Sequence, residues 1–339
     1  MTNSCDIKLS FGLEIGIIGT NFISDTFCEA LKILGITPAA VYSRAKETGE
    51  SFAAKHGIKN VFCDFDAFCS SDKINSAYVA SPNFCHSSQT LSLLEHGKHV
   101  LCEKPAAVNS YEFAKMRKLA SSRGLILMEA MRPVHDTAFN VIKKLLPQCG
   151  KLRFCHFEYS QYSSRYDRFK NGIMTNAFDP TLSNAAVMDI GVYPLHMCVY
   201  LFGRPESVIS RSVKLPNGFE GQGNVILGYG DMTAEIAYSK ITEASLPSFI
   251  RGEDAEISFG HALSKINEIA LTKRDGTKIP TEFSPVGNNM IFEIRDFCDC
   301  IAGKISPEGF LDATENTIYV MDEVRKQNGI EFPADKVIF

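Results

Sequence analysis

The sequence predicts an α/β protein in which a doubly wound parallel sheet is followed by a mostly antiparallel α+β part. Three observations support this fold class. Short apolar strand patterns alternate with helix patterns over about the first 130 residues, and strands of alternating polarity become common after residue 150. The length of 339 residues fits two domains. We therefore expect one domain at residues 1–130 and a second at residues 131–339.

The parallel sheet is predicted from a repeated order of strand, turn and helix. The first apolar run, residues 13–18, is rich in isoleucine and leads through a glycine turn into a helix pattern at residues 23–34. Further strand patterns lie at residues 39–42, 61–62, 76–80, 99–102 and 125–129, and further helix patterns at 47–56, 65–69, 86–95 and 110–122. Alternation of this kind is typical of a parallel sheet with helices on both faces.

The second half of the chain has a different pattern. Polarity alternates at residues 151–162, and residues 224–240 are typical of a hairpin that turns at Gly230-Asp231. Other strand patterns lie at residues 207–214, 251–259 and 268–273, and helix patterns at 138–146, 187–202, 290–302 and 312–327. This mixture predicts an α+β domain. We expect its last helix to pack back on the first domain.

The composition is that of an ordinary globular protein and excludes several classes. Hydrophobic residues make up 45% and charged residues 22%, which rules out a disordered chain, collagen or a coiled coil. The net charge of −4 gives no general attraction to nucleic acid or an anionic bilayer, so we expect neither as a partner. The first ten residues lack the basic and apolar regions of a signal peptide, and no apolar run is long enough to cross a bilayer. The sequence thus predicts a cytoplasmic protein.

Eleven cysteines are scattered along the chain without a repeating frame. We expect reduced thiols that pack as small hydrophobic groups. Cys298 with Cys300, and Cys63 with Cys69, could each supply two soft ligands, but neither pair has a second pair at the spacing of a zinc site. The prediction is therefore that the protein has no metal site.

A glycine turn after the first predicted strand indicates a site for a dinucleotide. In the motif G-x-G-x-x-G, backbone N–H groups and a helix N-terminus approach a pyrophosphate. Gly19 takes the first glycine position, but Asn21 and Ser24 take the second and third. Asn tolerates left-handed backbone geometry and Ser is small, so both can be accommodated. A turn that merely links a strand to a helix is the alternative. The predicted cofactor contacts of this turn are Gly19, Thr20, Asn21, Phe22 and Ile23.

The end of the second predicted strand favours NADP over NAD. An acidic residue at this place binds the ribose 2′-hydroxyl of NAD, whereas an arginine accommodates the 2′-phosphate of NADP. The chain has Ser43 and Arg44 there and no acidic residue. A hydroxyl beside a guanidinium suits a phosphate. The alternative is that Arg44 is a solvated surface residue.

A series of motifs after residue 80 carries a family resemblance. Glu103-Lys104-Pro105 directly follows the fifth predicted strand. The loop at residues 80–83 with His86, the segment at 128–132 and the helix at 188–196 occur in a matching order. In these motifs the chain resembles the Gfo/Idh/MocA oxidoreductases, from residue 13 to about residue 333. Several motifs in order are more specific than any one of them.

The resemblance implies a Rossmann domain followed by an α/β domain with a large, mainly antiparallel sheet, whose open face commonly forms a homodimer or a dimer of dimers. It also implies hydride transfer between NADP or NAD and a hydroxyl or carbonyl carbon of a sugar, polyol or diol. Tyr193, four residues after Asp189, resembles the dihydrodiol dehydrogenase and glucose-fructose oxidoreductase branch, because inositol dehydrogenase-like members have His there. The further cofactor contacts that the resemblance implies are Ser81, Pro82, Asn83, His86, Glu103, Lys104 and Arg132.

Lys104, Tyr193 and Asp189 are the predicted catalytic residues. Hydride transfer at a carbinol carbon needs a group that moves the proton of the oxygen and a positive charge near the developing alkoxide. A phenol with its ordinary pKa near ~10 is a poor base at neutral pH, but a neighbouring ammonium stabilises the phenolate. We assign Tyr193 as the proton donor or acceptor and Lys104 as the positive charge near the developing alkoxide, although the two roles can be reversed. Asp189 would orient a substrate hydroxyl or hold Lys104.

The predicted substrate contacts are Lys104, His135, Asp189, Tyr193 and His196. On one α-helix, Asp189, Tyr193 and His196 would share a face. For His135 and His196 a structural role in the core is an equal alternative. Weaker substrate candidates are Tyr162, Arg165 and Asn176.

Two other functions remain open from the sequence. A nucleotide-sensing regulatory protein with this fold and no turnover is favoured by Asn21 and Ser24, whereas the presence of Lys104, Asp189 and Tyr193 argues against it. The second is a reaction without net redox, in which a tightly held cofactor is reduced and reoxidised in one cycle.

Overall fold

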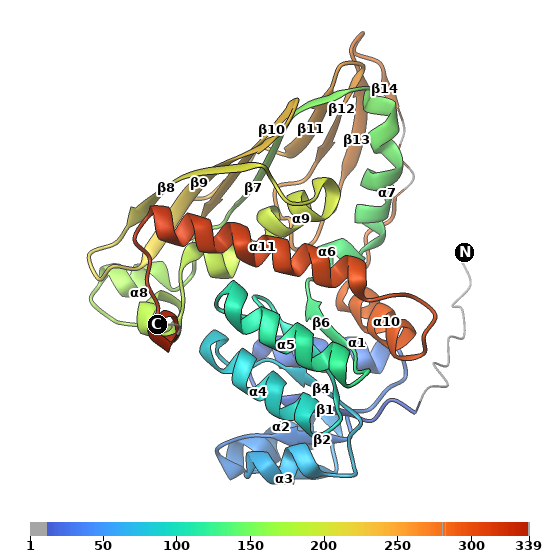
Figure 1. Ribbon diagram of the computed structural model, residues 1–339, viewed down its shortest axis with the longest axis vertical. Coiled ribbons are helices and arrows are strands. Elements are labelled where there is room, and N and C mark those ends of the chain that lie inside the picture. The colour runs from blue at the N-terminus through green and yellow to red at the C-terminus, as the bar shows by residue number, and fades with distance from the viewer. Residues whose placement is uncertain (1–11, 280, 282, 338–339) are drawn as a thin grey trace.

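The computed structural model describes residues 12–279, 281 and 283–337, and Figure 1 shows their arrangement. Two sheets lie at opposite ends of the molecule, and helix α11 (Glu308–Gln327) runs between them. Cys5 and the first ten residues, for which the sequence predicts no signal peptide, lie outside the described residues.

The first sheet, sheet A, has six parallel strands in the order β3-β2-β1-β4-β5-β6. These are β1 (Ile15–Ile18), β2 (Ala40–Tyr42), β3 (Asn60–Phe62), β4 (Ser76–Val79), β5 (His99–Glu103) and β6 (Leu127–Ala130). The strand order reverses between β1 and β4, and ligands of open α/β sheets bind beyond the carboxyl ends of the strands at such a point. The predicted doubly wound parallel sheet is confirmed.

The helices of this part cover the sheet as the sequence predicts. They are α1 (Phe22–Ile33), α2 (Lys46–His56), α3 (Phe65–Ser70), α4 (Asn83–Glu95) and α5 (Ser110–Ser122). Helix α1 begins after Asn21, whose side chain caps it, and buries Phe27 and Leu31 in one core with Ile15 and Ile17 of β1. This packing sets the N-terminus of α1 next to the carboxyl end of β1.

The second sheet, sheet B, has eight strands in the order β14-β13-β12-β11-β7-β10-β9-β8. These are β7 (Leu152–Ser160), β8 (Ser207–Lys214), β9 (Glu220–Tyr229), β10 (Met232–Ser239), β11 (Ser248–Gly252), β12 (Ala255–Phe259), β13 (Ile269–Lys273) and β14 (Lys278–Ile279). All neighbouring strands are antiparallel except β7 and β10, which are parallel. The prediction of a mainly antiparallel sheet is confirmed, and the carboxyl ends of β7 and β10 lie together at one edge.

The prediction of a single strand at residues 251–259 is wrong. The chain forms a hairpin there, because β11 ends at Gly252 and β12 begins at Ala255. A Cβ atom at Gly252 would lie 2.0 Å from the main-chain oxygen of Cys149, so this close approach requires glycine. Alternating polarity continues on both sides of the turn, and for that reason the pattern did not indicate a break.

The helix predicted at residues 187–202 has two parts with different geometry. Residues Val187–Gly191 form a π-helix, η4, and α9 (Val192–Phe202) continues from it. The other helical elements are α6 (Arg132–His135), α7 (Thr137–Leu145), η1 (Leu146–Cys149), α8 (Tyr166–Lys170), η2 (Asn176–Phe178), η3 (Pro180–Leu182), α10 (Met290–Ile301) and η5 (Pro333–Val337). Within the described residues, no helix has both the length and the apolar character needed to span a bilayer.

The last two long helices pack against the N-terminal part, and α11 also contacts sheet B. Met290 and Phe297 of α10 belong to one hydrophobic core with Ile15 and Phe27 of the N-terminal part. Helix α11 contacts α5 and β6 on one side and α9 and β8 on the other. The C-terminal helices therefore lie against the N-terminal part, and the domain boundary at residues 130 and 131 stays a prediction.

Candidate active site

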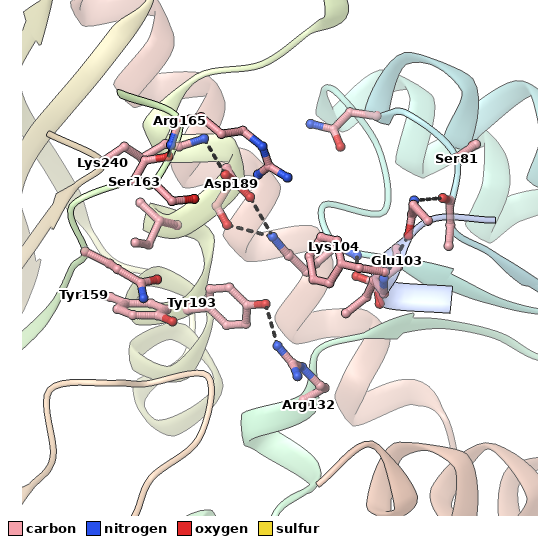
Figure 2. Close-up of a pocket in the computed structure, with 18 of the residues that line it drawn as sticks. Ser81, Glu103, Lys104, Arg132, Tyr159, Ser163, Arg165, Asp189, Tyr193 and Lys240 are labelled. Carbon is pink, nitrogen blue, oxygen red and sulfur yellow. Dashed lines mark hydrogen bonds and ion pairs between the residues drawn. The ribbon is translucent and has the colours of Figure 1, made fainter. Parts of the chain in front are cut away.

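A pocket of about 470 Å³ lies between the carboxyl edge of sheet A and the ends of β7 and β10. We call it the central pocket, and Figure 2 shows side chains from both sides directed into it. The predicted site residues in its wall are Asn21, Phe22, Ile23, Ser81, Asn83, His86, Glu103, Lys104, Arg132, Asp189 and Tyr193. The other lining residues are Ala80, Tyr159, Gln161, Tyr162, Ser163, Ser164, Arg165, Ile190 and Lys240.

Lys104 makes the central polar contacts of this pocket. It directly follows β5, and its side chain is only 15% exposed. Its Nζ donates to the main-chain oxygen of Asp189 at 2.7 Å and to Asp189 Oδ1 at 3.1 Å. The same ammonium lies 4.9 Å from the centre of the Tyr193 ring. The structure thus brings the three predicted catalytic residues together, as Figure 2 shows.

The charges of Lys104 and Asp189 stabilise each other. Burial alone would lower the pKa of Lys104, but the oxygen of Tyr193 and the carboxylate of Asp189 outweigh burial and raise this pKa above its usual range. Burial alone would raise the pKa of Asp189, but Lys104 and Lys240 hold it well below its usual range. At neutral pH the pair is therefore an ammonium and a carboxylate.

The ring of Tyr193 is held by an arginine and a second tyrosine. Arg132 Nη2 donates to the Tyr193 hydroxyl oxygen at 3.4 Å. Tyr159 packs edge-on against Tyr193, with 5.5 Å between the ring centres, and its own hydroxyl lies 2.8 Å from Ser264 Oγ. The phenol oxygen of Tyr193 therefore lies in the field of two cations, Lys104 and Arg132.

Buried polar contacts fix the chain on either side of Lys104. The hydroxyl of Tyr78 donates to Glu103 Oε1, and Glu103 Oε2 accepts from the Lys104 backbone N–H at 3.2 Å. His86 Nδ1 lies 2.9 Å from the main-chain oxygen of Pro105. Burial lowers the pKa of His86, so the neutral ring is favoured. Glu103 and His86 thus position the backbone from which Lys104 projects.

A second hollow, of about 620 Å³, continues from the central pocket along the ends of β1, β2 and β4. We call it the strand-end groove. It shares Asn21, Ala80 and Ser81 with the central pocket. The predicted cofactor residues that line it are Gly19, Thr20, Asn21, Ser43, Arg44, Ser81 and Pro82. The two hollows are therefore contiguous along the carboxyl edge of sheet A, where doubly wound sheets bind dinucleotides.

The turn at the start of this groove keeps the first glycine of the motif, although the second and third glycines are replaced. Gly19 has φ +98°, and a Cβ atom there would lie 2.5 Å from the main-chain oxygen of Ala80. Asn21 Oδ1 accepts from the backbone N–H groups of Ile23 and Ser24 at 2.9 and 3.3 Å. The Nδ2 of Asn21 donates to the main-chain oxygen of Ala80 at 3.0 Å. Asn21 therefore caps α1 and ties the turn to β4.

Ser24 and Arg44 also suit a nucleotide site. Ser24 is fully buried where the motif needs a small residue between helix and sheet. Arg44 is exposed in the groove, and its side chain makes no hydrogen bond or ion pair with any residue that the structure describes. Ser43 Oγ donates to the main-chain oxygen of Ala45 at 2.9 Å, which leaves its lone pairs available. A free guanidinium at this place can bind a phosphate.

The structure does not bring His135 and His196 into the central pocket. His135 Nδ1 lies 2.6 Å from Asp296 Oδ2, and His196 Nε2 lies 3.4 Å from Glu129 Oε2 inside the core. Tyr193 and His196 both lie in α9, where three residues make less than a full turn, so the two side chains point in different directions and His196 enters the core. The expectation that these histidines contact the substrate is corrected: both have structural contacts.

Lys240 and Tyr159 are pocket residues that the sequence did not indicate. Lys240 Nζ donates to Asp189 Oδ2 at 2.5 Å, and Tyr159 contacts Tyr193. Both lie at the carboxyl ends of β10 and β7, so only the parallel pairing of these two strands could have identified them. Of the weaker candidates, Tyr162 and Arg165 line the pocket, whereas Asn176 does not.

Comparisons with known proteins identify the family. Residues 13–131 match the family described as "Oxidoreductase family, NAD-binding Rossmann fold", and residues 146–258 match the "GFO/IDH/MocA C-terminal domain". These matches cover more than half of the chain, which therefore belongs to the Gfo/Idh/MocA oxidoreductases. The predicted family, enzyme class and nicotinamide dinucleotide cofactor are confirmed.

Within the described residues, no group of three or more His, Cys, Asp or Glu side chains could hold a metal ion.

Named relatives cover nearly the whole chain. It is 39% identical to scyllo-inositol 2-dehydrogenase (NADP(+)) of Bacillus subtilis over 96% of this chain and 99% of the relative. It is 26% identical to human trans-1,2-dihydrobenzene-1,2-diol dehydrogenase, again over 96% and 99%. Its fold is similar to a 3-ketoreductase from Actinomadura kijaniata in complex with NADP and TDP-benzene, with a TM-score of 0.82, 19% identity and coverage of 93% and 98%. This last likeness concerns the fold alone.

Proposed function

We propose that this chain is an NADP-dependent dehydrogenase or reductase that acts on a hydroxyl or carbonyl carbon of a polyol, sugar or related diol. The observation that carries the proposal is the contact of Lys104, Asp189 and Tyr193 in the wall of the central pocket, which the strand-end groove adjoins. When bound, the nicotinamide would supply or accept the hydride. The relative that is 39% identical is named for a polyol and for NADP(+), which supports the substrate class and the cofactor.

The charges in the pocket favour one assignment of roles. The raised pKa of Lys104 keeps its ammonium charged at neutral pH, so Lys104 is unsuited to remove a proton. Tyr193 then donates or accepts the proton of the substrate oxygen. Lys104 and Arg132 stabilise the negative charge that develops on the phenol or the substrate oxygen. Asp189 holds Lys104 in place.

The wall opposite sheet A supports a hydroxyl-rich substrate. Gln161, Ser163 and Ser164 offer amide and hydroxyl groups, and Tyr159 and Tyr162 offer phenols beside their rings. Several donors and acceptors on one wall can bind several hydroxyl groups of one molecule. A polyol or sugar therefore suits this wall better than an apolar diol.

The strand-end groove supports NADP as the preferred cofactor. Arg44 is free to bind the 2′-phosphate, with Ser43 beside it. Gly19, Thr20 and Asn21 would approach the pyrophosphate at the N-terminus of α1. The remaining cofactor contacts of the proposal, toward the nicotinamide end, are Phe22, Ile23, Ser81, Pro82, Asn83, His86, Glu103, Lys104 and Arg132.

The test is a titration of the purified protein with NADPH and NADH, followed by turnover assays. Cofactor fluorescence reports binding, and nucleotide released on denaturation reports a tightly held cofactor, the mark of a reaction without net redox. Scyllo-inositol, glucose and a trans-diol are then assayed with NADP+. We expect NADPH-selective binding and NADP+ reduction by at least one polyol or sugar. Binding without any turnover would instead favour a regulatory protein.

We also propose that the protein is a cytoplasmic homodimer. Helices cover one face of sheet B in Figure 1, whereas Ile209, Val213 and Ile226 of β8 and β9 are exposed. Ile209 and Ile226 are paired across the two strands, which makes an apolar patch. The cysteines that the structure describes are free thiols, as is usual in the cytoplasm. Sedimentation of the purified protein tests the dimer.

A further inference from the structure

Lys240 is a buried cation in the central pocket. The roles of Lys104, Arg132, Asp189 and Tyr193 in the proposed reaction leave it without a function. It directly follows β10, and its side chain is 7% exposed. Its Nζ donates to Asp189 Oδ2 at 2.5 Å and to the main-chain oxygen of Ala177 at 3.0 Å. The ammonium also lies 5.2 Å from the centre of the Phe178 ring and 5.5 Å from that of Phe219. Burying an ammonium is costly without such partners, so these contacts define its position.

The carboxylate of Asp189 connects Lys240 to Lys104. Oδ2 of Asp189 accepts from Lys240, and Oδ1 accepts from Lys104 at 3.1 Å. With both oxygens engaged, the carboxylate cannot rotate without breaking a charge-assisted hydrogen bond. Figure 2 shows the two lysines on opposite sides of Asp189.

We propose that Lys240 is a positioning residue of the hydride-transfer site. It holds Oδ2 of Asp189, so that Oδ1 and the main-chain oxygen of Asp189 fix the Lys104 ammonium beside Tyr193. The proposal rests on the proposed function, because it assigns Lys240 to the same reaction. Lys240 acts through Asp189 and needs no contact with the substrate.

The position of Asp189 explains why a second cation is required here. Residue 189 lies in the π-helix η4, and its side chain is 46% exposed to the pocket. A partly exposed carboxylate with a single partner can rotate toward solvent. Lys240 approaches from sheet B, on the side away from Lys104, and removes this freedom. A displacement of a catalytic group by about 1 Å can cost ~10²-fold in rate.

The test compares three substitutions of Lys240 with a matched control. Lys240→Met removes the charge and both hydrogen bonds, Lys240→Gln keeps a donor for Ala177, and Lys240→Arg keeps the charge. Lys214→Met is the control, because Lys214 Nζ donates to the main-chain oxygen of Gly329 outside the pocket. The probe is scyllo-inositol with NADP+, or whichever polyol or sugar gives the highest turnover with the wild type.

We expect kcat to fall by about 10- to 100-fold in Lys240→Met and Lys240→Gln. The KM for NADP+ should stay within about 3-fold, Lys240→Arg should recover most of the rate, and Lys214→Met should stay within about 2-fold of the wild type. An unchanged kcat in Lys240→Gln would overturn the proposal. So would a loss in Lys240→Arg as large as in Lys240→Met.

A double-mutant cycle distinguishes two roles of Lys240. Lys240 either positions the Asp189 carboxylate or only holds the chain segment at Ala177. If Lys240 acts through Asp189, adding Lys240→Gln to Asp189→Asn should change kcat by less than about 2-fold. A loss as large as in the wild-type background would show that Lys240 acts independently of Asp189, which contradicts the proposal.

A crystal structure of Lys240→Gln tests the proposal without any turnover. We expect the Asp189 carboxylate to rotate and its contact with Lys104 Nζ to be lost. Retention of this contact would overturn the proposal. A wild-type protein that binds NADPH but converts no polyol or sugar would reject the proposed function, and the contact between Lys104 and Asp189 in this crystal structure would still decide the role of Lys240.

Discussion

The two walls of the central pocket hold their functional groups in different ways. On the sheet A side, Lys104 directly follows β5 and Arg132 begins α6 two residues after β6, so the register of the parallel strands places the backbone of both residues. On the sheet B side, Asp189 and Lys240 come from a π-helix and a strand end, and they are held by each other. One wall is positioned by the backbone and the other by ion pairs. The second wall should therefore respond more strongly to a change of charge.

The largest expected effect is the loss of turnover when the contact between the two walls is removed. In Lys104→Met the cation is lost, and in Tyr193→Phe the proton-transfer group is lost. We expect kcat to fall by about 10³-fold or more in each, while the affinity for NADPH stays within about 3-fold. Steady-state kinetics and a fluorescence titration measure both quantities.

A matched control for Tyr193→Phe is Tyr111→Phe, because Tyr111 is exposed on α5. Tyr111→Phe should have wild-type kinetics. Wild-type rates in both Lys104→Met and Tyr193→Phe, with a confirmed substrate, would contradict the assignment of the site.

The next effect concerns Glu129, which joins the two parts of the molecule beneath the pocket. Its Oε1 accepts from the Ala106 N–H at 2.8 Å, and its Oε2 accepts from Thr314 of α11 at 2.9 Å. Burial raises the pKa of Glu129 from 4.5 to about 7. A carboxyl group with a raised pKa contributes stability that is full below pH 4.5 and is lost as the pH rises through 7.

The substitution Glu129→Gln should abolish this pH dependence, because the amide stays neutral. The wild type should lose on the order of 3 kcal/mol of unfolding free energy relative to Glu129→Gln between pH 4.5 and pH 7. Urea unfolding at pH 5 and pH 8 measures this difference, with the exposed Glu331→Gln as the control. A difference that does not change with pH would show that Glu129 is ionised in the folded protein.

A smaller effect is expected at the far end of the strand-end groove. Arg44→Ala should weaken NADPH binding by about 10- to 100-fold, because a charged hydrogen bond contributes roughly 1.5 to 3 kcal/mol, and should leave NADH binding unchanged. Fluorescence titrations with both cofactors measure it. Lys46→Ala is the control, since Lys46 is exposed and pairs with Glu50. Equal losses of affinity for NADPH and NADH would contradict the proposal that Arg44 binds the 2′-phosphate.

The difference between the two walls also explains what the sequence could predict. Strand patterns place Gly19, Ser43 and Lys104 at the carboxyl ends of the parallel strands β1, β2 and β5, and a sheet of this topology brings such ends to one edge. No local pattern indicates that residue 240 meets residue 189, because their contact depends on the parallel pairing of β7 and β10. The π-helical turn before α9, which carries Asp189, likewise has no signal in the apolar spacing.

The smallest expected effect concerns Asn21, which replaces the second glycine of the motif in the turn after β1. It tests whether Asn21 stabilises the start of α1 or weakens cofactor binding. If Asn21 acts as the N-cap of α1, Asn21→Ala should cost about 1 kcal/mol of unfolding free energy, whereas Asn21→Gly should cost only a few tenths. Urea unfolding measures both, and NADPH titration of the same variants measures the cofactor site. Asn21→Gly should bind NADPH as the wild type does. In that case the departure from glycine stabilises the helix start at no loss to the nucleotide site, and the main argument for a regulatory protein without turnover disappears.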